Sequence, residues 1–145
     1  MISIAALLTY FSAAAQKRLV LRNPDSGEVY AEFAVEEGER FSITFIHSVN
    51  KTPVTDVYEI RGGEIYAVET RYYSFGAGVQ TEIEEGQSLN YAEDGAMVVS
   101  GIDKLVSGMI YVVGKVSDHS LEIGGCAYSL TELCGKGSPV QFICK

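Results

Sequence analysis

The chain has 145 residues, of which 47% are hydrophobic and 21% charged, a composition typical of a globular domain that excludes an extensively disordered chain. Its formal net charge is −8 and its 11 Lys and Arg residues are scattered, so we expect no nucleic-acid partner. A chain of this length buries enough surface to fold as one domain without a metal or disulfide staple.

The first 15 residues differ from the rest of the chain. Residues 2–15 carry no charge and end in Ala13-Ala14-Ala15, a small-x-small pattern of the kind that signal peptidases cleave. The run is shorter than the roughly 20 residues needed to cross a bilayer. We therefore predict that residues 1–15 are a signal peptide or a truncated membrane anchor. The alternative is a short amphipathic helix or strand that belongs to the fold.

From residue 17 onward, turn signals recur every eight to twelve residues, which is typical of a β-sandwich or barrel. No segment after the leader shows a sustained helical period, apart from one helical turn within Ser129–Leu133. Gly124-Gly125 indicates a tight hairpin. The expected strands are Lys17–Arg22, Glu28–Val35, Arg40–Val49, Pro53–Ile60, Glu64–Phe75, Val79–Ile83, Gln87–Tyr91, Ala96–Ile102, Met109–Val116, Leu121–Ile123, Ala127–Leu130 and Val140–Cys144. We predict that residues 16–145 form a single all-β domain, an antiparallel β-sandwich or partly open barrel of about 8–11 short strands.

The clearest strand, Arg40–Val49, is followed by a polar loop. Alternation along this strand places Phe41, Ile43, Phe45, His47 and Val49 on one face. His47 should therefore point inward, where an imidazole needs a hydrogen-bond partner. Ser48, Lys51 and Thr52 gather donors in the loop, which indicates a corner that binds an anion or carboxylate. The alternative is a core histidine that only orders the loop.

A second polar segment spans residues 69–78. Strand alternation places Glu69, Arg71, Tyr73 and Phe75 on the face of Ile65 and Ala67, so Glu69 would need a cation such as Lys51 or Arg71. Gly76-x-Gly78 permits a sharp turn, but it lacks the third glycine of a dinucleotide-binding loop and the Gly-Lys of a P-loop. We predict that His47 and the segment Glu69–Gly78 meet in space, with Tyr73 and Ser74 offering hydroxyls to His47.

Catalytic and metal signatures are weak. His47 and Ser48 are adjacent on the expected strand and should face opposite sides, so they cannot form a nucleophile–base pair. A metal site built from His47, His119 and nearby carboxylates has no diagnostic spacing. We expect no catalytic residue, metal or cofactor. Cys126, Cys134 and Cys144 match no zinc pattern and are interpreted as small buried hydrophobes, or as one disulfide with a spare thiol.

Two segments carry a family resemblance. They are Phe45-Ile46-His47-Ser48-Val49-Asn50-Lys51-Thr52-Pro53-Val54 and Glu69-Thr70-x-Tyr72-x-Ser74-Phe75-Gly76-Ala77-Gly78. With Val116-Ser117-Asp118-His119-Ser120-Leu121 and residues 128–133, they resemble an uncharacterised bacterial family of small exported proteins. The genes of that family commonly lie beside TRAP transporters (tripartite ATP-independent periplasmic transporters) with TAXI-type solute receptors. The resemblance implies an extracytoplasmic domain that is periplasmic, on the cell surface or membrane-anchored.

Three functions follow as hypotheses. The first is a non-enzymatic accessory domain that binds a membrane transporter component or a small acidic solute. The second is a structural or interaction module whose polar motifs serve only its own fold. The third is an enzyme of unknown type that uses His47 as a general acid or base. The candidate residues for a ligand-binding or structural polar cluster are His47, Ser48, Lys51, Thr52, Glu69, Tyr73, Ser74, Gly76 and Gly78.

Deleting residues 1–15 tests the leader hypothesis. We expect a chain that begins at Gln16 to remain soluble and to unfold cooperatively in urea, because the uncharged run is not needed to complete the core. An insoluble or unfolded product would assign the run to the fold instead.

Overall fold

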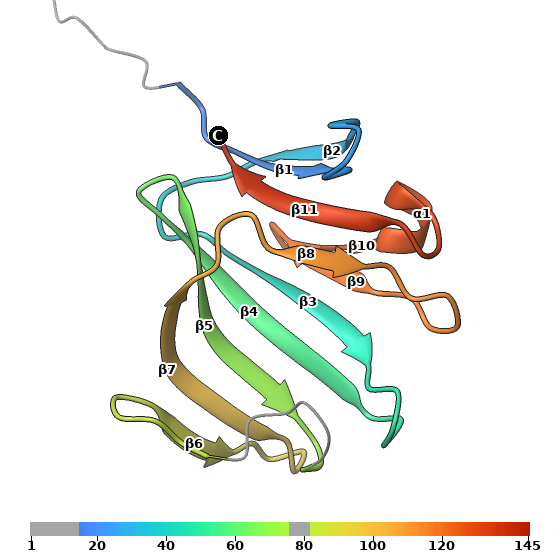
Figure 1. Ribbon diagram of the computed structural model, residues 1–145. Coiled ribbons are helices and arrows are strands. Elements are labelled where there is room, and N and C mark those ends of the chain that lie inside the picture. The colour runs from blue at the N-terminus through green and yellow to red at the C-terminus, as the bar shows by residue number, and fades with distance from the viewer. Residues whose placement is uncertain (1–14, 76–81) are drawn as a thin grey trace, which may run out of the picture.

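The computed structural model of the protein describes residues 15–75 and 82–145, which form two antiparallel sheets and one short helix (Figure 1). The elements are β1 (Arg18–Arg22), β2 (Val29–Ala34), β3 (Arg40–Ile46), β4 (Pro53–Arg61), β5 (Glu64–Tyr72), β6 (Ser88–Tyr91), β7 (Met97–Leu105), β8 (Ile110–Val112), β9 (Ser120–Ile123), β10 (Cys126–Ser129), α1 (Leu130–Cys134) and β11 (Pro139–Cys144). No helix in this described part is long and apolar enough to cross a membrane.

The smaller sheet has the strand order β2-β1-β11-β8, and the larger has the order β10-β9-β3-β4-β5-β7-β6. Neither sheet closes into a barrel, so the all-β prediction is confirmed in its sandwich form. Figure 1 shows the smaller sheet lying over one end of the larger one, while β6 lies at the far end. The last strand, β11, enters the middle of the smaller sheet, between β1 and β8.

Local turn chemistry accounts for the tightest connections. Gly124 and Gly125 have φ angles of 58° and 76° and join β9 to β10 as the expected two-residue hairpin, because glycine adopts positive φ without a steric penalty. Ser129 caps α1 by accepting a hydrogen bond from the Glu132 N–H at 3.0 Å, which confirms the predicted helical turn.

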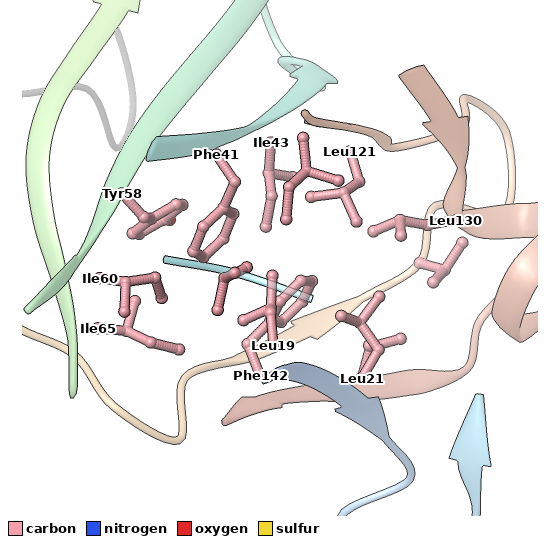
Figure 2. Packing of buried hydrophobic residues seen from close by; sticks show 14 residues of the cluster. Leu19, Leu21, Phe41, Ile43, Tyr58, Ile60, Ile65, Leu121, Leu130 and Phe142 are labelled. Atoms are coloured by element: carbon pink, nitrogen blue, oxygen red, sulfur yellow. The ribbon is translucent and has the colours of Figure 1, made fainter. Parts of the chain in front are cut away.

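The main core lies between the two sheets, and alternate residues of strands such as β1, β3 and β4 contribute to it (Figure 2). Phe142 of β11 is fully buried; its ring lies nearly parallel to that of Phe41 at 6.1 Å, and Phe41 stacks on Tyr58 at 5.2 Å. Leu19, Ile43 and other aliphatic side chains surround these rings. Burial of apolar area on this scale is the main favourable term in folding, at about 25 cal/mol per Å².

A second, smaller core lies at the far end of the larger sheet. Tyr72 and Val54 pack there with Met97 and Val99 of β7, and Phe45 lies against this group. The larger sheet therefore buries its inner face in two places, of which only the first is covered by the smaller sheet.

Several expected strands are shorter in the structure. The strand predicted as Arg40–Val49 ends at Ile46, and Val49 is 68% exposed, so the inward direction expected for residues 47–49 is wrong for Val49. The strand expected at Met109–Val116 is limited to Ile110–Val112. Glu82 and Ile83 are not in a strand, and the rest of the strand expected at Val79–Ile83 lies outside the described residues.

A β-bulge in β5 corrects the predicted facing of residues 69–75. Tyr58 pairs with Ala67, whereas Asp56 pairs with Thr70, so β5 contains one extra residue relative to β4. The extra residue reverses the alternation beyond Ala67. Tyr72 is consequently buried, at 1% exposure, and Tyr73 is exposed. The prediction that Glu69, Arg71, Tyr73 and Phe75 share the face of Ile65 and Ala67 is therefore wrong.

The three cysteines are free thiols. Cys134 and Cys144 are partly buried against the main core, as small hydrophobes would be. Cys126 is exposed on the edge strand β10, which contradicts the interpretation of all three as buried residues. The alternative with one disulfide is not formed.

Truncation of Phe142 should show how far the two sheets depend on its ring. We expect Phe142→Ala to lower the free energy of unfolding by about 3–5 kcal/mol, because it opens a cavity between the sheets. The matched control is Ile110→Ala on neighbouring β8. Its side chain is 54% exposed, so its removal should change the free energy of unfolding by less than about 0.5 kcal/mol. Urea unfolding followed by circular dichroism measures both, and equal effects would contradict the packing argument.

Candidate functional site

A cleft opens between two connections that are far apart in sequence, the β3–β4 turn (residues 47–52) and the β8–β9 loop (residues 113–119). Both lie at the right of Figure 1. Its volume is about 270 Å³. The residues that line it are Ile46, His47, Ser48, Lys51, Gly114, Lys115, Val116, Ser117 and His119, and we call it the basic cleft.

The β3–β4 turn is a six-residue connection that contains a strained lysine. The His47 N–H donates to the Thr52 carbonyl at 2.8 Å, and the Lys51 N–H donates to the His47 carbonyl at 3.0 Å. To close this loop, Lys51 adopts a φ of 58°, a left-handed conformation in which Gly or Asn is the usual residue. A lysine in this conformation reduces the free energy of unfolding, and strained backbone conformations of this kind cluster at functional sites.

The β8–β9 loop folds tightly around Gly114. A Cβ atom at this position would lie 1.8 Å from the Ser117 carbonyl oxygen, so only glycine allows the loop to close. The Gly114 N–H donates to Nδ1 of His119 at 3.0 Å. Because Nδ1 is the acceptor, the neutral ring carries its proton on Nε2. Burial lowers the pKa of His119, with Asp118 opposing the effect, which favours this neutral form.

Aromatic rings hold His119 in place. The ring of Phe45 stacks on the imidazole at 5.4 Å, and the ring of Tyr111 meets it edge-on at 5.9 Å. Tyr111 also contacts Phe142 edge-on at 6.0 Å, which joins this group to the main core. The imidazole is therefore oriented by both sheets, since Phe45 belongs to β3 and Tyr111 to β8.

A chain of hydrogen bonds starts at Tyr58, passes through Tyr111 and ends on the partly buried carboxyl group of Asp56. Asp56 accepts from Thr70 Oγ1 at 2.7 Å and from the Tyr111 hydroxyl at 3.0 Å. Tyr111 donates its only proton to Asp56, so it must accept from Tyr58, whose hydroxyl contacts it. Burial raises the pKa of Asp56, while the bonds from Thr70 and Tyr111 oppose the rise. Burial and the Asp56 charge also raise the pKa values of Tyr58 and Tyr111.

The electrostatic character of the basic cleft differs from that of the whole chain. The chain carries a net charge of −8, yet among the described residues that line the cleft there are two lysines and no carboxylate. Asp118 is next to His119 in sequence but is engaged elsewhere. Its oxygens accept from the Ser129 hydroxyl, from the Thr131 N–H at 2.9 Å and from Thr131 Oγ1 at 2.7 Å.

Of the predicted site residues, His47, Ser48 and Lys51 line this cleft together. His47 is half-buried, and its Nδ1 accepts from the Val49 N–H at 3.3 Å. Thr52 is a partner within the turn, because its hydroxyl donates to Asn50 Oδ1 at 3.0 Å and its carbonyl accepts from His47. The first polar segment therefore lines the cleft and also forms the hydrogen bonds that close its own turn.

The second polar segment is used differently. Glu69 lines another hollow, with Arg40, Arg61 and Asp103, and no ion pair joins it to Lys51. Tyr73 donates to Asp94 at 2.7 Å, and Arg71 forms an ion pair with the same carboxylate at 2.6 Å. The Tyr73 hydroxyl, the Ala96 N–H and Arg71 lower the pKa of Asp94 to about 2. These contacts attach the end of β5 to the β6–β7 turn.

The remaining predicted residues sit at the end of this segment. Ser74 Oγ is buried and has no hydrogen-bond partner within residues 15–75 and 82–145. Gly76 and Gly78 lie outside the described residues. The meeting of His47 with the segment Glu69–Gly78 therefore stays a prediction.

Sequence reasoning missed the second wall of the cleft, formed by Lys115, Ser117 and His119. Residues 116–121 were recognised as a motif, but no pattern within the chain links them to His47, more than sixty residues earlier. The available signal was that His47 and His119 are the only two histidines of the sequence and that both lie in segments that carry the family resemblance. Among the described residues, no group of three or more His, Cys, Asp or Glu side chains is placed to hold a metal ion.

A scan against protein-family models matches residues 41–130 to the family described as Domain of unknown function (DUF1850). The match covers more than half of the chain. The chain belongs to this family. The matched DUF1850 segment runs from β3 to the first residue of α1 and contains every residue of the basic cleft. Neither the curated proteins nor the solved structures gave a match.

The pH dependence of stability tests the partly buried carboxyl group of Asp56. Because the folded state raises the pKa of Asp56, the protonated carboxyl favours folding below its unfolded pKa of about 3.9, and this contribution is lost as the pH rises through the folded pKa. Asp56→Asn has no such loss, so we expect its stability relative to the natural protein to increase between pH 3 and pH 7. Urea unfolding across this range measures the difference.

The isosteric change Thr70→Val serves as the control. It removes a hydrogen bond that lowers the pKa of Asp56, so in the natural background it should move the pH range in which stability is lost to higher pH. In the Asp56→Asn background it should leave the pH dependence of stability unchanged. A relative stability of Asp56→Asn that decreases with rising pH would show that the folded state favours the carboxylate.

Proposed function

We propose that this protein is a non-enzymatic, extracytoplasmic accessory domain that binds a small organic acid in the basic cleft. The observation that carries the proposal is the composition of the cleft. Its lining residues include Lys51, Lys115 and His119, whose neutral ring carries a proton on Nε2, and no carboxylate, in a chain of net charge −8. A site built from donors matches a ligand that offers only acceptors, as a carboxylate does.

The strained backbone of Lys51 supports the same proposal. A lysine at φ 58° is less favourable for folding than a glycine in the same turn would be, and its side chain lines the cleft. A role in ligand binding explains why a cation occupies this position.

The resemblance described above extends the proposal to a cellular setting. Proteins of the resembled family are commonly encoded beside TAXI-type TRAP transporters, which handle small solutes outside the cytoplasm. We propose that the domain associates with a component of such a transporter. Co-purification of the full chain from membranes with the neighbouring transporter tests this association separately from ligand binding.

For the second polar segment (residues 69–78), the structural hypothesis, in which polar residues serve only the fold, is favoured. The contacts of Arg71 and Tyr73 with Asp94 join β5 to the β6–β7 turn, and they need no ligand to be satisfied. The hypothesis of an enzyme that uses His47 as an acid or base rests on no specific observation, and we do not favour it.

Substitution of Lys51 separates binding from folding. We expect Lys51→Met to weaken the binding of small carboxylates at least about fivefold, because a charge-assisted hydrogen bond is lost. The control is Lys104→Met, which removes the same charge from an exposed site on β7. Isothermal titration with 4-methylpentanoate, succinate and leucine measures affinity. If none of the three binds, or if both variants lose affinity equally, the proposal fails.

The stability of Lys51→Gly provides the second measurement. Glycine relieves the left-handed strain but makes the unfolded chain more flexible, so the free energy of unfolding should stay the same or increase by up to about 1 kcal/mol. A loss of more than about 2 kcal/mol would show that the Lys51 side chain maintains the fold, as the structural alternative requires.

A further inference from the structure

The side chains that line the basic cleft favour the carboxylate of a zwitterion over its ammonium group. Its charged side chains are Lys51 and Lys115, and the His119 ring offers its Nε2–H because Nδ1 already accepts from Gly114. The hydroxyls of Ser48 and Ser117 can accept a hydrogen bond, but they carry no charge to balance an ammonium group.

Two carboxylates adjoin the residues around His119, and both are committed to other partners. Asp118 is bound by Ser129 and Thr131 at the start of α1. Asp56 lies behind the Tyr111 ring and is bound by Tyr111 and Thr70. Neither group lines the cleft, so an ammonium group in the cleft would face like charges without a compensating anion.

Apolar side chains occupy the rest of the lining. Val116 is fully exposed at the tip of the β8–β9 loop, and Ile46, at the end of β3, is 41% exposed. Both would lose contact with water under the hydrocarbon part of a ligand, which favours binding in proportion to the area covered. The cleft volume of about 270 Å³ lies just below the roughly 300–1,000 Å³ typical of ligand pockets, so the ligand is small.

We infer that the basic cleft selects small carboxylates that have an apolar body and lack an ammonium group, and that it discriminates against amino acids of the same skeleton. This inference rests on the proposed function, because it assumes that the cleft binds a carboxylate at all. It adds the class of ligand and the physical basis of selectivity.

A matched pair of ligands tests the inference on the full chain. Leucine is 4-methylpentanoate with an α-ammonium group, so the pair differs mainly at the point in question. We expect 4-methylpentanoate to bind at least about tenfold more tightly than leucine at pH 7, because like charges brought together in a partly desolvated site are strongly unfavourable. Inorganic sulfate, an anion without an apolar body, should bind more weakly than 4-methylpentanoate.

A pair of variants at Val116 tests the charge argument within the protein. Val116 is fully exposed, so Val116→Asp and Val116→Asn should both fold. The two differ by one negative charge at the cleft. We expect Val116→Asp to weaken 4-methylpentanoate binding at least about threefold relative to Val116→Asn. It should also reduce the ratio of the affinities for 4-methylpentanoate and leucine.

Each outcome has a distinct meaning. Leucine binding as tightly as 4-methylpentanoate would overturn the selectivity and leave the proposed carboxylate site intact. Sulfate binding as tightly as 4-methylpentanoate would overturn the role of the apolar lining. Failure of every carboxylate to bind would overturn both the proposed function and this inference.

Discussion

The contact between Phe142 and Phe41 is the interaction on which the rest of the structure depends. It joins β11 to β3, an interior strand of the larger sheet, across the space between the two layers. Because β11 lies between β1 and β8, anchoring it also anchors its neighbours. β11 therefore organises the smaller sheet.

The basic cleft is a consequence of that anchoring. β8 is only three residues long and pairs with β11 alone, so Tyr111 reaches His119 and Asp56 because β11 holds β8 over the larger sheet. The β8–β9 loop then faces the β3–β4 turn. The cleft combines a wall that is formed by a local hairpin with a wall that is positioned by the whole fold.

Polar residues in this protein have two kinds of role, and sequence pattern alone does not separate them. Lys51 accepts backbone strain and lines a cleft, whereas Tyr73 and Arg71 are used to hold the Asp94 turn. Both segments belong to the DUF1850 match, so membership of the family does not distinguish them either. The bulge in β5 makes the difference, because it turns Glu69 and Tyr73 away from the core face.

The sequence by itself determined the all-β class, most strand positions, the Gly124-Gly125 hairpin and the polar character of the β3–β4 turn. These features depend on periodicity and turn chemistry over a few neighbouring residues, so they can be predicted from the sequence alone. The bulge near Val68 and the partnership of His47 with His119 in one cleft were decided only by the tertiary structure. A bulge depends on how a neighbouring strand pairs, and the cleft depends on the docking of β11 and β8. Neither interaction leaves a local pattern, because the residues that cause it are distant in the chain.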